Sequence, residues 1–232
     1  MTRLFPAIII IAALLSCARM PAVSPVPPEA AQGFREACAR VFPAGDWQLV
    51  HAIETVMGGR RGTMMGVSVI SPGSRTVHCA LMTLEGLSMF EARDRDGRIT
   101  VDRAVPPFDS PAFARGMLED IRMIFFQPGP GPDEAGLAPS GSPLCRYRPG
   151  PDETVDVTVD PRGGWTLRRY EGAALVRTVH AGAGTLIASG GVRISRHLQL
   201  TARGPRPYTL DLKLLEAVPL APHPRDPENG SP

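Results

Sequence analysis

The chain has 232 residues, of which 43% are hydrophobic and 21% charged, and its formal net charge is +2. A charge so close to zero gives no bulk attraction toward nucleic acid, so we expect no nucleic-acid partner. Without its two ends the chain keeps roughly 190 residues, enough for one domain with a hydrophobic core.

The first residues have the features of a bacterial lipoprotein signal. One charge, Arg3, precedes an almost uninterrupted apolar run from Leu4 to Leu15. About 12 residues are too few to span a bilayer core, which needs ~20, but they suit the hydrophobic region of a secretory signal. Leu14-Leu15-Ser16 then leads into Cys17, which resembles a lipobox, where the cysteine thiol accepts diacylglycerol. We expect residues 1–16 to be a cleaved signal peptide and Cys17 to be lipidated; the alternative is an ordinary signal followed by a chance cysteine.

Residues 17–28 are expected to form a lipidated tether. Four of them are proline, which favours an extended polyproline geometry and prevents the packing of a core. At ~3.1 Å per residue, a free tether of this kind would hold the domain roughly 30 Å from the membrane. Ala18 after Cys17 resembles the outer-membrane sorting pattern, so we expect an anchored envelope protein that faces the periplasm. Residues 218–232 are also proline-rich and are expected to be a disordered tail.

Between these ends, residues 29–217 are predicted to form one mainly β domain with one or two helices. The first helix is expected over residues 29–41, and the second begins with Ser110 as its N-cap and ends before Pro128. Apolar residues alternate in about ten to eleven short segments, which are separated by turn residues and spaced as hairpins. That spacing excludes a doubly wound parallel sheet. We predict a strongly curved antiparallel half-barrel that wraps the second helix, with a long loop over residues 127–143.

Many apolar side chains of this half-barrel are methionine, whose flexible side chain adapts to irregular apolar shapes. Ordinary core filling is the alternative to a plastic cavity. The residues expected to line the cavity are Met65, Val67, Val69, Leu81, Met89, Phe113, Met117, Ile121, Ile124 and Phe125.

Three cysteines remain besides Cys17, and an odd number permits at most one bridge and one spare thiol. Cys79 alternates with apolar neighbours in a predicted strand and is interpreted as a buried free thiol. The preferred disulfide joins Cys38 of the first helix to Cys145 of a later strand.

No pattern indicates an enzyme, a metal site or a cofactor. His78 and Cys79 are adjacent in a strand, so their side chains point to opposite faces and cannot form a catalytic couple. Glu119 and Asp120 lie about 100° apart on the second helix and are interpreted as its solvated face. The glycine-rich residues 58–62 could cradle a phosphate with their amides, but a plain turn between strands is favoured.

Two sequence segments within this order of parts are distinctive, GLSMFEARDRDGRI and FARGMLEDIRMIFFQP. Together with the lipobox, the short first helix and the runs of hairpins, they resemble the LolA/LolB superfamily of lipoprotein carriers over about residues 30–217. The chain is more closely similar to a group of uncharacterised outer-membrane lipoproteins with that expected fold, which tend to be encoded among genes for acyl-chain assembly and export. The resemblance implies an open half-barrel whose hydrophobic cavity takes acyl chains, with helices as a lid. It also implies an acylated lipid or a lipoprotein as the client.

Two functions therefore stay open. The first is a membrane-tethered module that binds acyl chains or lipidated clients in its cavity. The second is a structural or assembly lipoprotein whose core is filled and whose outer face docks another envelope protein.

Overall fold

The computed structural model describes residues 20–183, 185–187 and 192–221. It contains two long helices, α1 (Pro28–Ala39) and α2 (Pro111–Phe125), and a short 3-10 turn, η1 (Pro72–Ser74). The strands, most of which are joined as hairpins, are β1 (Trp47–Met57), β2 (Arg60–Ser71), β3 (Thr76–Met82), β4 (Ser88–Arg95), β5 (Arg98–Ala104), β6 (Glu134–Leu137), β7 (Pro143–Tyr147), β8 (Glu153–Val159), β9 (Trp165–Glu171), β10 (Ala174–Ala181), β11 (Thr185–Ile187), β12 (Arg193–Ser195), β13 (His197–Ala202) and β14 (Tyr208–Pro219).

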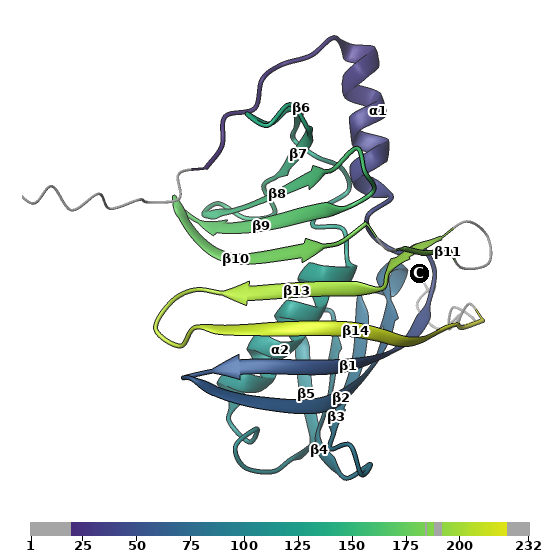
Figure 1. Cartoon of the computed structure of the whole chain (residues 1–232), viewed down its shortest axis with the longest axis vertical. Helices are drawn as coiled ribbons and strands as arrows, with labels where there is room; N and C mark the ends of the chain where they lie inside the picture. The colour runs from purple at the N-terminus through teal and green to yellow at the C-terminus, as the bar shows by residue number, and fades with distance from the viewer. Residues whose placement is uncertain (1–19, 184, 188–191, 222–232) are drawn as a thin grey trace, which may run out of the picture.

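Twelve of these strands form one antiparallel sheet in the order β5-β4-β3-β2-β1-β14-β13-β10-β9-β8-β7-β6 (Figure 1). The last strand, β14, pairs with β1 and so joins the two halves of the chain into a continuous sheet. The sheet is curved, and it stays open because its two edge strands, β5 and β6, do not pair with each other. The predicted antiparallel half-barrel is confirmed, with a small separate hairpin of β11 and β12 beside it.

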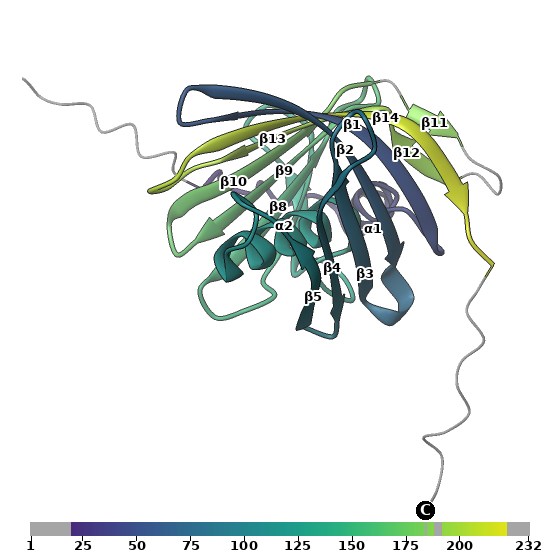
Figure 2. The same ribbon diagram turned by 90° about the horizontal axis from the view of Figure 1, so that it is seen from below.

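The sheet arches over α2, which lies on its concave side (Figure 2). The helix begins where the sequence indicates, since the Ser110 hydroxyl accepts a hydrogen bond from the amide of Phe113 at 3.1 Å and Pro111 occupies the first turn. Its apolar face carries Leu118 and Ile121 into the core, where side chains from both halves of the sheet meet.

A disulfide between Cys38 and Cys145 fixes α1 to β7, and both residues are fully buried. The structure thus contains the pairing preferred from the sequence. Cys79 is a free thiol with 1% of its surface exposed, and burial raises its pKa to about 12, so the thiol stays protonated and unreactive.

Residues 127–143, expected to be one long loop, contain the edge strand β6. The strand β6 has only four residues, which pair with β7. In a segment rich in glycine and proline, so short a strand shows no alternating pattern. Further along the chain, the neighbouring strands β12 and β13 belong to different sheets. The signal peptide, Cys17 and most of the expected tail lie outside the described residues.

Candidate functional site

The concave face of the sheet is apolar over most of its width. Strands from both halves of the chain point side chains to this side, and α2 covers them. If the helix were absent, the sheet would present an apolar surface of the kind that marks binding sites. The buried side chains of this face include Leu49, Ile53, Val77, Leu81, Phe90, Val179, Leu198, Leu200 and Leu212.

A small pocket borders the C-terminal end of α2 on this face. A pocket bordered by Ile124 and Phe125 of the helix, and by Trp165 and Leu198 opposite them, has a volume of about 10 Å³. This is roughly the volume that one water molecule requires. The open cavity expected from the sequence is therefore absent at this position, because the helix packs directly onto the sheet.

Six of the predicted cavity residues do meet at the interface between helix and sheet. The aromatic ring of Phe113 packs edge-on against Phe90 of β4, with ring centroids 5.1 Å apart. The six that belong to this shared core are Leu81, Phe113, Met117, Ile121, Ile124 and Phe125.

The predictions for Met65, Val67 and Val69 of β2 were wrong. These side chains are partly exposed, whereas their neighbours Gly66 and Ser68 are buried, so the three residues lie on the face away from α2. Side chains of a strand alternate between faces, and here the more hydrophobic row points outward.

Ile53 of β1 fills the space beside Gly66 on the inward face. A Cβ atom added to Gly66 would lie 2.5 Å from Cδ1 of Ile53, so the missing side chain leaves the room that Ile53 occupies. The prediction for Met89 was also wrong. Met89 lies at an irregularity between β3 and β4, where the register shifts after Leu81, and it is not a member of the shared core.

Arg122 of α2 ties the helix to β4. Its Nε atom lies 2.6 Å from Oδ2 of Asp94, whose side chain is 4% exposed. A second guanidinium nitrogen donates to the carbonyl of Arg75, in the turn between β2 and β3, at 3.0 Å. Nothing in the sequence indicates this pair, because its partners are far apart in the chain.

Asp120 forms a second buried attachment and corrects the expectation of a solvated helix face. Arg177 of β10 donates to its Oδ1 atom at 3.1 Å, and the hydroxyl of Tyr208 on β14 donates to its Oδ2 atom. Asp120 is 6% exposed. Burial raises the pKa of its carboxyl, although the bonds from Tyr208 and Arg177 act in the opposite direction. Burial, with Asp120 next to it, also raises the pKa of Tyr208.

His51 of β1 is a buried polar side chain under α2, with its ring centroid 6.0 Å from that of Phe125. It is 3% exposed, and its Nε2 atom has no hydrogen-bond partner among the residues that the structure describes. Burial lowers the pKa of His51 to about 4, so the ring is neutral at physiological pH. Orphaned polar atoms of this kind are rare in native cores and call for an explanation.

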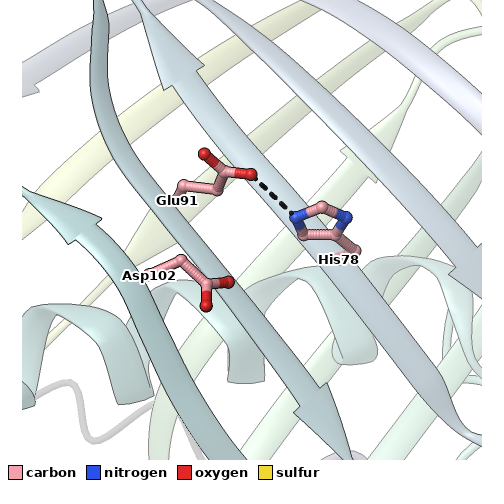
Figure 3. A group of neighbouring side chains, drawn as sticks. All are labelled: His78, Glu91 and Asp102. Carbon is pink, nitrogen blue, oxygen red and sulfur yellow. Dashed lines mark hydrogen bonds and ion pairs between the residues drawn. The ribbon is translucent and has the colours of Figure 1, made fainter.

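On the opposite face of the sheet, His78 of β3, Glu91 of β4 and Asp102 of β5 offer ligand atoms within 4.8 Å of one another (Figure 3). His78 Nε2 lies 3.2 Å from Glu91. Arg93, however, donates to both oxygens of Asp102 at 2.9 and 2.7 Å and lowers the pKa of that carboxyl. The guanidinium of Arg93 already supplies a positive charge to Asp102, and we assign no metal to this group.

No family model matches the chain, and no curated protein matches its sequence. Among solved structures, a LolA superfamily protein from Nitrosomonas europaea superposes with a TM-score of 0.55 at 11% identity, over 84% of this chain and 94% of the other. The fold is that of the LolA superfamily. At this identity, the likeness to LolA-like proteins shows the fold alone.

Two further matches to solved structures are weaker. A DUF1329 family protein from Desulfovibrio piger has a TM-score of 0.45 at 10% identity, over 84% of this chain and 94% of the other. A putative outer membrane lipoprotein-sorting protein domain from Vibrio parahaemolyticus has a TM-score of 0.42 at 11% identity, over 85% of this chain and 95% of the other.

Among the described residues, no helix is both long enough and apolar enough to cross a membrane.

Proposed function

We propose that this protein is a lipid-anchored lipoprotein of the cell envelope that binds acyl chains, or the acyl chains of lipidated clients, on the concave face of its half-barrel. The observation that carries this proposal is the relation between that face and α2. A broad apolar surface, built by both halves of the chain, is covered by α2, while α1 covers only its end at β6 to β8. The lipobox-like sequence at Cys17 supports the anchor, and Ala18 after it supports an outer-membrane location.

Because α2 packs onto the sheet, an acyl chain must displace it. The apolar packing between helix and sheet would then be replaced by packing of the acyl chain on the sheet, each Å² of buried apolar surface being worth ~25 cal/mol. The helix is also held by Arg122 and Asp120, and buried ion pairs add little net stability compared with apolar packing. These ion pairs therefore fix the position of α2 on the sheet but add little to the free energy needed to release the helix.

His51 supports the same proposal. When the helix covers it, its Nε2 atom is unpaired among the described residues. An acyl client with a polar ester or carboxyl end could supply the missing partner once the helix has moved.

The test is a titration of the purified lipoprotein with a fluorescent fatty acid, combined with native mass spectrometry to count bound lipids. Arg122→Met removes the attachment to Asp94 but keeps the length of the side chain, and Asp94 still accepts the amide of Gly97. We expect this variant to bind the probe about fivefold to tenfold more tightly, or ~1–1.4 kcal/mol. Arg115→Met makes the same change on the exposed side of α2 and should leave binding unchanged.

A specific observation favours the second candidate function. The pocket bordered by Ile124 and Phe125 of α2 has a volume of only about 10 Å³, as expected for a structural or assembly lipoprotein with a filled core. If neither the wild type nor Arg122→Met binds the probe, acyl binding is wrong. In that case the outer faces of the sheet become the sites at which an envelope partner would dock.

A further inference from the structure

The segment that precedes α1 does not run free, although its prolines favour a spacer. Ser24 forms an isolated bridge with Leu137 of the edge strand β6, in which each amide donates to the other residue's carbonyl at 2.9 Å. Further toward the N-terminus, the carbonyl of Pro21 accepts a hydrogen bond from Arg146 of β7 at 2.8 Å. The segment is thus fixed at two points to the edge of the sheet, beside β6 (Figure 1).

Two features of the sheet are shaped for this contact. A Cβ atom on Gly136 would overlap the carbonyl oxygen of Ser24 and approach Cγ1 of Val23 to 2.8 Å, so only glycine permits the segment to lie here. Arg146 is held in place by Asp156, which is fully buried and accepts two hydrogen bonds from it at 2.7 and 2.8 Å. A bidentate pair of this kind orients the guanidinium. Its Nη2 atom, which donates to Asp156, also donates to the carbonyl of Pro21.

The docked segment determines how far the domain can lie from its anchor. Cys17 is four residues before Pro21, and an extended chain covers ~3.5 Å per residue, so the lipidated residue can be at most about 14 Å from Pro21. A free polyproline tether would allow about twice that distance. The edge of the sheet at β6 is therefore held close to the membrane surface.

A groove of about 480 Å³ opens next to Pro21, on the face of β7 to β10 away from the core. Two basic side chains, Arg168 and His180, line the groove, together with one carboxylate, Asp160. Arg168 forms no ion pair with any of the residues that the structure describes. The rest of the lining mixes small hydroxyl side chains with Leu144 and other apolar groups, so the groove has both polar and apolar walls.

From these observations we infer that this face of the domain lies on the membrane and that the groove receives the phosphate head group of an anionic phospholipid. An unpaired arginine and hydroxyl donors suit a phosphate, and a basic side chain near an anionic surface contributes ~1 kcal/mol. The inference rests on the proposed lipid anchor at Cys17. It adds an orientation, in which the groove-bearing face next to β6 lies against the bilayer and the opposite edge of the sheet, β5, lies away from it.

The experiment measures energy transfer from the lipidated protein, in vesicles of phosphatidylcholine and phosphatidylglycerol, to acceptors on the lipid head groups. Donor dyes are attached to Ser140→Cys, an exposed position on the rim of the groove, and to Thr100→Cys, an exposed position on β5. Cys79 is buried and protonated and will not compete for the dye. We expect clearly higher transfer from position 140 than from position 100.

Two pairs of variants test whether the docked segment causes this difference. Ser24→Pro removes the amide that donates to Leu137, whereas Ser24→Ala keeps it. Gly136→Val places a side chain where the segment lies, whereas Gly131→Ala meets nothing within 4 Å. The first variant of each pair should reduce the difference in energy transfer between positions 140 and 100. The control variant should preserve that difference.

Binding to vesicles tests the groove itself. Arg168→Gln should weaken the binding of the lipidated protein to phosphatidylglycerol vesicles, but not to vesicles of phosphatidylcholine alone. Equal transfer from both dyes, in protein whose mass shows a lipid on Cys17, would overturn the orientation and leave the proposed function standing. A mass without lipid would overturn the anchor, and the orientation with it.

Discussion

Arg122 and Asp94 join α2, the helix on the concave face, to the sheet, with Nε and Oδ2 2.6 Å apart and the carboxylate 4% exposed. The pair lies at the inner side of a hairpin whose turn is also built by Asp94, since its Oδ1 atom accepts the amide of Gly97 at 2.9 Å. One carboxylate thus serves both the turn between β4 and β5 and the position of α2.

Removing this carboxylate should destabilise the fold. Asp94→Ala leaves the Arg122 guanidinium without its partner, and breaking one side of a buried pair is strongly destabilising. Because Arg122 is partly accessible to water, we expect the free energy of unfolding to fall by about 2–3 kcal/mol in urea titrations. A double-mutant cycle with Arg122→Met should show a coupling energy; additive effects would contradict an interaction between the two.

Acid should weaken the protein through His51. Its pKa is about 4 in the folded protein and 6.5 when free, so the unfolded state binds a proton first as the pH falls. Its contribution to the free energy of unfolding is complete above pH 6.5 and declines between pH 6.5 and 4, by up to about 3 kcal/mol. His51→Leu should remove this part of the pH dependence, whereas the exposed His197→Leu should retain it. Identical pH profiles for His51→Leu and wild type would show that His51 does not titrate in this way.

Reduction of the disulfide should release α1. The bridge between Cys38 and Cys145 closes a loop across a sequence separation of 107 residues, for which a loss of about 2–4 kcal/mol is typical. Chemical denaturation with and without dithiothreitol measures the effect, and Cys145→Ala should be insensitive to the reductant. The outcome that counts against the prediction is an unchanged midpoint in the wild type.

A side chain at Gly66 should lower the stability moderately. Gly66→Ala places its Cβ atom against Cδ1 of Ile53, which is the end of a side chain and can move, so we expect a loss of about 1 kcal/mol from overpacking. Ile53→Val removes that methyl group and should recover part of the loss in the double variant. Thermal unfolding of the two single variants and the double variant provides the comparison; no recovery would mean that another neighbour causes the strain.

The sequence predicted most of the fold, because its signals are local. Alternating residues and turns defined the hairpins, and Ser110 with Pro111 defined the start of α2. The sequence could not choose the face of β2, since the outward row of Met65, Val67 and Val69 is more hydrophobic than the inward row. The small residue in the inward row, Gly66, faces Ile53 of the neighbouring strand, and this contact between strands cannot be read from the pattern of β2.

The candidate site was harder to predict than the fold, because its polar attachments connect distant parts of the chain. Nothing near Asp120 indicates that Arg177 and Tyr208 would meet it and remove it from solvent. The docking of the proline-rich segment depends likewise on a contact between residues 24 and 137. Composition alone could describe that segment only as a spacer.

The displacement of α2 by an acyl chain can be measured most directly by hydrogen–deuterium exchange of residues 111–125, with and without a saturating fatty acid. We predict that the bound lipid speeds exchange in α2 while the strands β3 and β4 beneath it stay protected. Lipid binding that leaves exchange in α2 unchanged would contradict the account, because the chain would then be held somewhere other than the concave face.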